Sequence, residues 1–329
     1  MKQRAITAIF IVLTYALFIL LSIYLPQEYG KYFYDILIVA MMVIAGIEMS
    51  KALDKKFGKP IWQLVVINIL LGYGVFIAVQ NIEFFRGKNN GGITAFFGQT
   101  FLMFLICIIV NMVRQKQAQK NTEELTVYQE NAESKKTDKV DIRNILTTMF
   151  VMVYPVSLMV YMLAINYLPV AQNDLRVMAI MLTFLISSLT DTFAYLVGRQ
   201  IGGAKLAPII SPKKTISGAV GGIFGGIVAA FLVLLMGRFG VLNIVLFGGS
   251  NASLTTQTVH LLIIGIVASV LNQFGDIVAS YVKRACGAKD FGSIMPGHGG
   301  VLDRVDGMML VAIFVYTYIM IYGIFVIPA

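Results

Sequence analysis

The sequence is poor in charge and in cysteine, and each shortage excludes a class of protein. Charged residues make up 13% of the 329 residues, whereas soluble domains carry about 25%. With 58% hydrophobic residues and a mean hydropathy of +0.80, the chain has too few charges to cover a water-soluble globule of 36.2 kDa. Composition therefore excludes a soluble enzyme and a disordered chain. Cysteine occurs only at Cys107 and Cys286, too few for a disulfide framework or a cysteine-based zinc site.

Long apolar stretches are the dominant feature of the sequence. A helix that spans a bilayer needs about 20 mostly apolar residues, and open strands would leave backbone groups unpaired in lipid. The sequence therefore predicts an all-α polytopic membrane protein with about nine transmembrane helices. The first stretch lacks a small-residue cleavage site, so we interpret it as a retained helix and not as a signal peptide. The predicted spans are residues 5–25, 32–50, 61–80, 93–113, 145–165, 177–198, 217–236, 259–281 and 308–327.

The basic residues are unevenly distributed between the loops. The net charge is +9, from 26 Lys and Arg against 17 Asp and Glu. If the N-terminus lies in the cytoplasm and nine spans alternate, 21 of the 26 basic residues fall in cytoplasmic segments and 5 outside. Cytoplasmic loops are enriched in Lys and Arg, so this distribution predicts a cytoplasmic N-terminus. It also accounts for the basic charge without nucleic acid as a partner.

One long polar stretch, residues 114–143, divides the chain. It reads as a solvated cytoplasmic linker with no folded domain of its own. We therefore expect a four-helix N-terminal membrane region (1–113), this linker, and a five-helix C-terminal catalytic region (144–329). No internal repeat relates the two membrane regions, which disfavours a transporter built from inverted repeats.

Two aspartates lie inside predicted spans at similar depth. Asp191 and Asp276 are each about two helical turns from the cytoplasmic ends of the sixth and eighth spans. They predict one water-filled pocket that opens on that side. The alternative is that each aspartate only pairs with a basic residue at its helix end. Glu48 and Asp35 are weaker candidates. Glu48 lies near the cytoplasmic end of its span, beside Lys51, where it could simply face water, and Asp35 lies at the outer boundary of the same span.

The loop between the sixth and seventh spans is suited to an anion. It has four basic residues, no acidic one, and hydroxyl groups just before the next helix. Backbone N–H groups, the helix dipole and lysines then favour negative charge at one place. The alternative is that the cations only anchor helix ends, and no Gly-x-x-x-x-Gly-Lys-Ser/Thr loop is present. The candidate residues are Arg199, Lys205, Ser211, Lys213, Lys214 and Thr215.

The segment after the eighth span combines carboxylates, cations and glycines. Asp303 and Asp306 are spaced i, i+3 and share a face if the last span begins there. Carboxylates on one face suit Mg²⁺, which takes further ligands from water and from substrate phosphates. A passive, turn-rich connector is the alternative, but it would not need so many charges. The other candidates in this segment are Lys283, Arg284, Lys289, His298 and Arg304.

Residues 280–306 read Ser280-Tyr-Val-Lys283-Arg284-x4-Lys289-Asp290-x-Gly292, then His298-Gly-Gly-x-x-Asp303-Arg304-x-Asp306. This pattern closely resembles the signature of phosphatidate cytidylyltransferases, also called CDP-diacylglycerol synthases. Two further motifs are similar to that family, Asp191-Thr-x-Ala-Tyr195-x-x-Gly198-Arg199 and Ser211-Pro-Lys-Lys-Thr215. The resemblance covers about residues 187–307. Ser217 stands where members often carry Glu or Gln, and Met295 where Leu, Ile or Phe is usual.

The resemblance implies roles for these residues. Asp276 and Asp303 would hold metal ions, with Asp306 beside them; the family uses Mg²⁺, in some cases with K⁺. The remaining signature residues would take part in catalysis beside the metal ions; they are Lys283, Arg284, Lys289, His298 and Arg304. His298 fits phosphate binding or ordering of its glycine turn better than base catalysis. The nucleotide pocket would be formed by Asp191, Tyr195, Arg199, Ser211, Lys213, Lys214 and Thr215.

The implied reaction converts CTP and phosphatidate into CDP-diacylglycerol and pyrophosphate in phospholipid biosynthesis. A phosphate monoester with a second pKa of about 6 is largely dianionic at pH 7, so it attacks the α-phosphorus without a protein nucleophile. Cations would screen the repulsion between the two polyanions. We expect a site facing the cytoplasm in the cell membrane, in contact with bilayer lipid, in a chain that is compatible with a homodimer. Two alternatives stay open: a CTP-dependent enzyme for another lipid, and an anion transporter.

Overall fold

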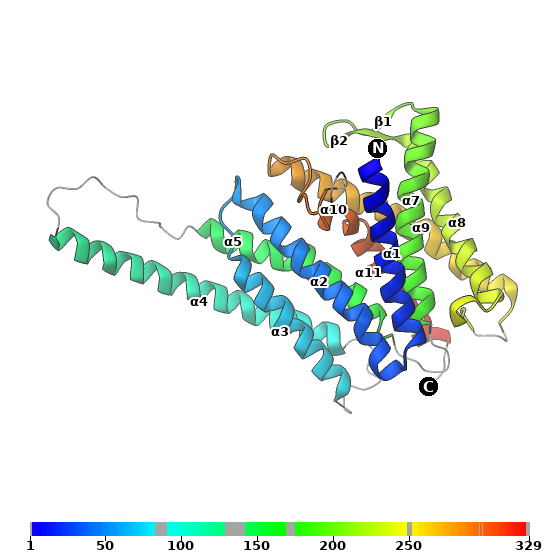
Figure 1. Cartoon of the computed structure of the whole chain (residues 1–329), viewed down its shortest axis with the longest axis horizontal. Helices are drawn as coiled ribbons and strands as arrows, with labels where there is room; N and C mark the ends of the chain where they lie inside the picture. Colours follow the sequence, from blue (N-terminus) through cyan, green and yellow to red (C-terminus); the bar gives the residue numbers. More distant parts are fainter. Residues whose placement is uncertain are drawn as a thin grey trace.

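The computed structural model describes residues 2–82, 91–128, 142–168, 175–248, 252–295, 297 and 299–326. The described chain is a bundle of helices with one short β hairpin at one end (Figure 1). The predicted all-α membrane fold is confirmed, because the apolar stretches are helical throughout the described residues.

The first half of the chain contains α1 (Lys2–Tyr24), α2 (Gln27–Asp54), α3 (Trp62–Asn81), α4 (Gly91–Tyr128), α5 (Ile142–Val151), the π-helical turn η1 (Met152–Ser157) and α6 (Leu158–Ile165). The second half contains α7 (Arg176–Ile201), β1 (Lys205–Ala207), β2 (Ser211–Thr215), α8 (Ile216–Arg238), the 3₁₀ turn η2 (Val241–Asn243), α9 (Leu254–Ala285), α10 (Leu302–Val305) and α11 (Met308–Val326). Each predicted span thus coincides with a helix or, for the fifth span, with the run from α5 to α6.

Within the described residues, seven helical runs are long and apolar enough to cross a membrane. Two shorter apolar helices, Leu13–Tyr24 and Met308–Gly323, lie in the first and last predicted spans. The total of nine spans and the side of the N-terminus stay predictions. The helix α4 continues to Tyr128, into the predicted linker, and residues 129–141 of that linker lie outside the described residues. The division into three regions also stays a prediction.

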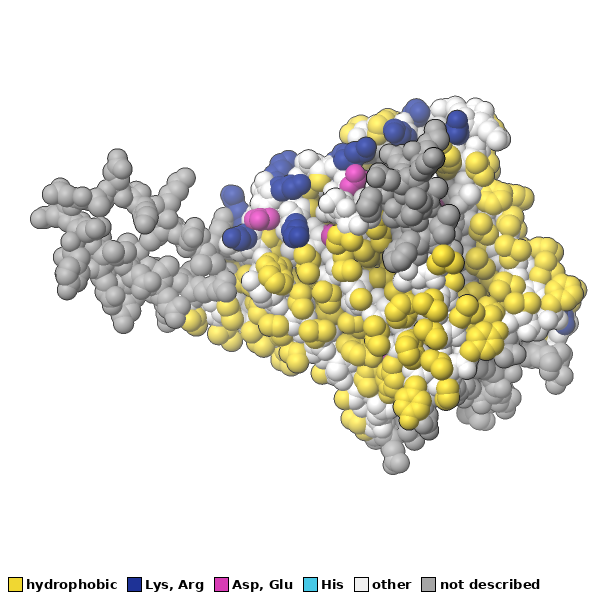
Figure 2. Space-filling view, in the orientation of Figure 1, with side chains coloured by type: hydrophobic (Ala, Val, Ile, Leu, Met, Phe, Trp, Pro, Cys, Tyr) yellow, Lys and Arg dark blue, Asp and Glu magenta, His cyan; other side chains and the backbone are white. Residues whose placement is uncertain are grey.

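The outer surface of the bundle is apolar over a wide band. Leu71 on α3, Phe101 on α4 and Phe231 on α8 each expose more than half of their area. Figure 2 shows hydrophobic side chains over much of the visible face, with Lys and Arg gathered along the edge where the hairpin lies in Figure 1. Soluble monomers rarely expose apolar patches of this extent. Lipid is the solvent that such a surface requires, and the chain is a membrane protein.

Glycines on α8 bring three helices into close contact. A Cβ atom on Gly225 would lie 2.5 Å from the carbonyl oxygen of Leu189 on α7, and one on Gly226 would meet the carbonyl oxygen of Gly265 on α9. Small residues at helix interfaces allow backbones to approach closely where no side chain intervenes. The helix α8 is therefore held tightly between α7 and α9, the two helices that carry Asp191 and Asp276.

The predicted loop between α7 and α8 is an ordered antiparallel hairpin. Lys205 pairs with Thr215, and Ala207 pairs with Ser211. Thr215 ends β2 in an extended conformation and caps α8, because its Oγ1 accepts a hydrogen bond from the backbone N–H of Gly218 at 3.1 Å. The cap requires extended backbone at the residue before the helix, which continues the strand up to the first turn of α8.

The helices of the second half are also tied to the first half. The helix α11 packs against α6, α7 and α9, and the short helix α10 packs against α2. The segment with Asp303 and Asp306 therefore lies between α2 of the N-terminal half and α9 of the C-terminal half.

The topology can be tested at the two ends of α8. Ile209 at the hairpin tip is 94% exposed, and Phe239 just after α8 is 80% exposed. In a cysteine-free background, we expect Ile209→Cys to react with a membrane-impermeant maleimide only from the cytoplasmic side. Phe239→Cys should react only from the opposite side, because α8 separates the two positions. The reverse labelling pattern would contradict the predicted orientation.

Candidate active site

A cavity of about 440 Å³ lies where α7, the hairpin, α8, α9 and α10 meet. It is lined by side chains that the sequence analysis had selected from four separate segments. Those residues are Asp191, Tyr195 and Arg199 from α7, Lys213, Lys214 and Thr215 from β2, Asp276 and Lys283 from α9, and Asp303, Arg304 and Asp306 from α10 and its C-terminal end. The predicted meeting of Asp191 and Asp276 in one pocket is confirmed.

Other predicted residues lie elsewhere. Ser211 begins β2 opposite Ala207 and does not line the cavity. Arg284 turns to the end of α9, where it donates to the carbonyl oxygen of Ala288 at 3.1 Å. Lys205 and Lys289 are exposed outside the lining. His298 lies outside the described residues, so its role stays a prediction.

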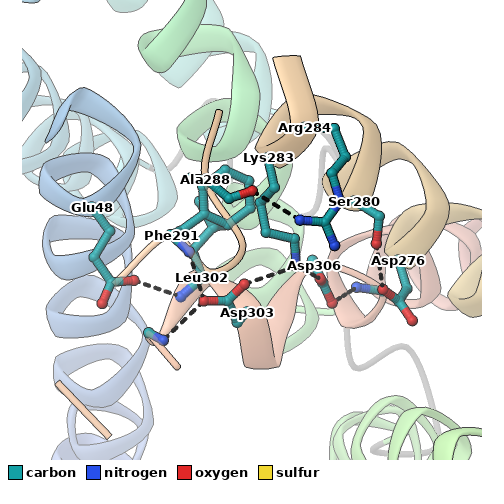
Figure 3. A network of polar contacts seen from close by, with 12 residues as sticks. Glu48, Asp276, Ser280, Lys283, Arg284, Ala288, Phe291, Leu302, Asp303 and Asp306 are labelled. Atoms are coloured by element: carbon teal, nitrogen blue, oxygen red, sulfur yellow. Dashed lines mark hydrogen bonds and ion pairs between the residues drawn. The ribbon is translucent and has the colours of Figure 1, made fainter. Parts of the chain in front are cut away.

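Asp303 is held from three directions (Figure 3). Its Oδ1 accepts from the Nζ of Lys283 at 2.8 Å, and its Oδ2 accepts from the backbone N–H groups of Phe291 and Gly300, both at 2.9 Å. The Lys283 ammonium also lies 3.9 Å from Oδ2 of Asp306 and 5.3 Å from the centre of the Phe291 ring. Both side chains of the closer pair are buried. Asp303 thus orders the loop that follows α9 as well as facing the cavity.

A second ion pair joins the hairpin to α9. The Nζ of Lys214 lies 2.6 Å from Oδ2 of Asp276, and both side chains are partly exposed to the cavity. Oδ1 of Asp276 accepts a hydrogen bond from Ser280 at 3.4 Å. This pair brings one cation of the predicted anion-binding loop to one carboxylate of the predicted metal site.

Asp191 is connected to α9 by a residue that the sequence analysis did not select. The Nδ2 of Asn272 donates to Oδ1 of Asp191 at 2.8 Å, and Oδ1 of Asn272 accepts from Ser187 at 2.8 Å. Asn272 lies one helical turn before Asp276, so the i, i+4 spacing placed both on one face of α9. That spacing is the sequence signal that could have identified Asn272 as a site residue. Gln273 and Asp290 also line the cavity and were not selected.

The carboxylates of the cavity repel one another. Burial, and then the negative charge of Asp276, raise the pKa of the Asp306 carboxyl well above its usual value, while Lys283 opposes this shift. Oδ1 of Asp306 is partly compensated by the backbone N–H of Gly307 at 2.8 Å. Additional positive charge at this place would lower the repulsion.

The donor set fits Mg²⁺ as a partial set of ligands. Within the described residues, no three His, Cys, Asp or Glu side chains form a complete metal cluster. Mg²⁺ in phosphate-transfer sites usually takes one or two carboxylates and completes its shell with water and substrate phosphates. Asp276, Asp303 and Asp306 fit this pattern, because a lysine ammonium lies beside each one where a cation is needed.

Neither of the two weaker carboxylate candidates faces water. Glu48 is 3% exposed and accepts hydrogen bonds from the backbone of α10. Asp35 is fully buried and accepts from Asn166 at 2.8 Å, Tyr167 at 2.5 Å and Tyr73 at 3.1 Å. The water-facing interpretation of Glu48 was wrong, because backbone groups distant in the sequence supply its hydrogen bonds.

Comparisons with known proteins show the family of the chain. The model of the cytidylyltransferase family matches residues 2–322, and the chain belongs to that family. Similar proteins include the phosphatidate cytidylyltransferases of Brucella suis biovar 1, 42% identical over 133 residues, and of Staphylococcus saprophyticus, 43% identical over 132 residues. These matches span 39% and 40% of this chain but only 42% and 45% of those relatives. The enzyme of the same name from Rickettsia conorii is 35% identical over 175 residues, which is 53% of this chain and 69% of the relative.

The buried ion pair predicts a specific stability effect. We expect Asp303→Ala to lower the free energy of unfolding by about 3–5 kcal/mol, because it leaves Lys283 buried without its closest partner. Asp290→Ala is the control, since Asp290 is exposed and its loss should change stability by less than about 0.5 kcal/mol. Thermal unfolding of the purified protein in detergent measures both. Equal melting temperatures for the two variants would contradict the assigned role of the pair.

Proposed function

We propose that this protein is a CTP:phosphatidate cytidylyltransferase, which forms CDP-diacylglycerol and pyrophosphate from CTP and phosphatidate. The observation that carries the proposal is the cavity that Lys213 and Lys214 of the hairpin line, and in which Lys214 pairs with Asp276 of α9. Membership of the family and the names of the relatives from Brucella, Staphylococcus and Rickettsia support the same activity.

The nucleotide occupies the hairpin side of the cavity in this proposal. Lys213, Lys214 and Arg199 provide positive charge there, and Tyr195 lies beside Arg199, whose Nη1 donates to the Tyr195 hydroxyl at 3.3 Å. The dipole of α8, whose N-terminus lies beside these residues, also favours negative charge at this place. The triphosphate would take Lys214 from Asp276 and leave this carboxylate free for a cation.

The lipid phosphate is itself the nucleophile, so the protein needs to orient it and screen charge. Asp276, Asp303 and Asp306 would hold Mg²⁺, which supplies positive charge to the phosphates when bound. Lys283 and Arg304 line the same part of the cavity and offset the charge of a second phosphate. The chain's contribution is thus alignment of two polyanions in one place. The roles of Arg284, Lys289 and His298, and the participation of K⁺, are kept as parts of the proposal.

The membrane position of the site follows from the substrates. CTP is soluble and phosphatidate is held by its acyl chains, so the cavity has to open to both water and lipid. We place it at the cytoplasmic face of the cell membrane, where the basic residues of the hairpin and of the α2–α3 turn are exposed. On α8, Val220 and Phe224 are exposed and follow Gly218 and Ala219, which line the cavity, so apolar surface lies close to it in the sequence.

The metal role of Asp276 can be tested by substitution. We expect Asp276→Ala to lower CDP-diacylglycerol formation at least about 100-fold, or about 2.7 kcal/mol in barrier height, even at high Mg²⁺. The protein should still fold, because the side chain is partly exposed and its contacts are one ion pair with Lys214 and one long hydrogen bond from Ser280. The assay uses purified protein, labelled CTP, phosphatidate in mixed micelles and lipid extraction, with the exposed Asp54→Ala as control. Product formation only from other lipid phosphates, or anion uptake without pyrophosphate release, would favour the two alternative functions.

The nucleotide role of the hairpin predicts a difference between lysine and arginine. Lys214 places a compact ammonium 2.6 Å from Asp276, and we expect the wider, planar guanidinium to fit poorly there. We expect Lys214→Arg to raise the KM for CTP about 10-fold and to leave the KM for phosphatidate nearly unchanged. Lys205→Arg on the same hairpin is the control, because Lys205 does not line the cavity. If Lys214→Arg and Lys214→Ala both keep the parental CTP dependence, the hairpin only anchors α8 at the membrane surface.

A further inference from the structure

A buried carboxylate from the N-terminal half reaches the loop of the candidate active site. Glu48 lies near the end of α2 and is 3% exposed. Its Oε1 accepts a hydrogen bond from the backbone N–H of Val301 at 3.1 Å, and its Oε2 accepts from Leu302 at 2.9 Å. Figure 3 shows Glu48 directed at the start of α10, on the side away from Lys283. The proposed reaction assigns no role to this residue.

Two glycines make the space that Glu48 occupies. At Gly292 and at Gly300, the nearest atoms to an added Cβ all belong to the Glu48 side chain, and each Cβ would overlap its carboxylate. Neither glycine has a positive φ, so the backbone conformation alone does not require glycine at either position. Close approach of the loop to Glu48 is the physical reason for the missing side chains.

The same short stretch of backbone is held from its other side by Asp303. The N–H groups of Phe291 and Gly300 donate to Asp303, while those of Val301 and Leu302 donate to Glu48. Hydrogen bonds to charged acceptors are stronger than neutral ones. Two carboxylates therefore fix one loop between them, and only Asp303 faces the cavity.

We infer that Glu48 is a positioning residue of the active site, which holds the 291–302 loop so that Asp303 and Arg304 face the cavity. This inference rests on the proposed function for its effect on the reaction. It gives the N-terminal helices a part in catalysis, because α2 contributes a buried contact to this loop. Residues that orient metal-binding carboxylates usually affect activity about 10–100-fold when they are changed.

The test compares Glu48→Gln and Glu48→Ala with Ser50→Ala. Ser50 is a matched control on the same helix, since it is also buried and its hydroxyl donates to the carbonyl oxygen of Gly46. We expect Glu48→Ala to lower kcat about 10–100-fold and to raise the Mg²⁺ concentration for half-maximal activity. Glu48→Gln keeps one acceptor oxygen and the same size, so it should fold and show a smaller shift in the same direction.

A structural readout tests the contact without the reaction. By hydrogen exchange, peptides covering residues 291–302 should exchange about 10-fold faster in both Glu48 variants than in the parent and in Ser50→Ala, because two amides lose a charged acceptor. Unchanged exchange in Glu48→Ala would overturn the inference. A parent protein that makes no CDP-lipid would count against the proposed function instead, while the exchange result would still decide the contact.

The glycine contact supplies a second, independent check. Gly300→Ala should lower kcat about 10-fold in the parent, because the new methyl group displaces the Glu48 carboxylate. In the Glu48→Ala background the same change should cost little, since the space is then free. Additive effects of the two substitutions, or Mg²⁺ dependence identical to that of Ser50→Ala in both Glu48 variants, would contradict the positioning role.

Discussion

The cost of burying an ammonium group governs the arrangement of this site. Lys283 is 8% exposed at the end of a membrane-spanning helix, where an unpaired charge would be costly. It is compensated by Asp303 at 2.8 Å and, at longer range, by Asp306. Asp303 accepts two further backbone hydrogen bonds, so compensation of one lysine also fixes the course of the loop after α9. The course of the loop, the position of the short helix α10 and this wall of the cavity therefore all depend on one buried ion pair.

Close backbone contact is the second requirement, and it couples helix packing to the site. A Cβ on Gly275 would lie 2.7 Å from the carbonyl oxygen of Asp306, and one on Gly307 would overlap the side chain of Asn272. These two glycines let the turn between α10 and α11 lie directly on α9. Asn272 thereby lies against Gly307 while its Nδ2 donates to Asp191, one of the residues that line the cavity. The glycine contacts that pack α9 against the turn before α11 therefore also position polar residues beside the cavity.

Much of this arrangement could be predicted from the sequence, because its signals are local. Apolar runs gave the helices, and the depth of Asp191 and Asp276 within two of them gave the common pocket. The hairpin was not predicted, since its two strands are very short and carry no alternating pattern. Glu48 was misjudged for a different reason. Its partners, Val301 and Leu302, are 253 and 254 residues away and are backbone groups, which leave no trace in side-chain identity. In the sequence, only Gly292 and Gly300 reflect that contact, and a glycine in a loop can equally reflect a turn.

The charge balance of the cavity constrains how substrates enter it. Among the described residues, its lining has five carboxylates and five cationic side chains, and the closest pairs neutralise one another. In the proposed reaction, a triphosphate alone would compete with Asp276 for Lys214 and leave that carboxylate uncompensated. A divalent cation alone would be placed beside Lys214 and Lys283. Entry of the nucleotide together with its cation changes the balance least, because the phosphates take the lysines while the cation takes the carboxylates. In the proposed reaction, the two preformed ion pairs would therefore favour a metal–nucleotide complex over either component alone.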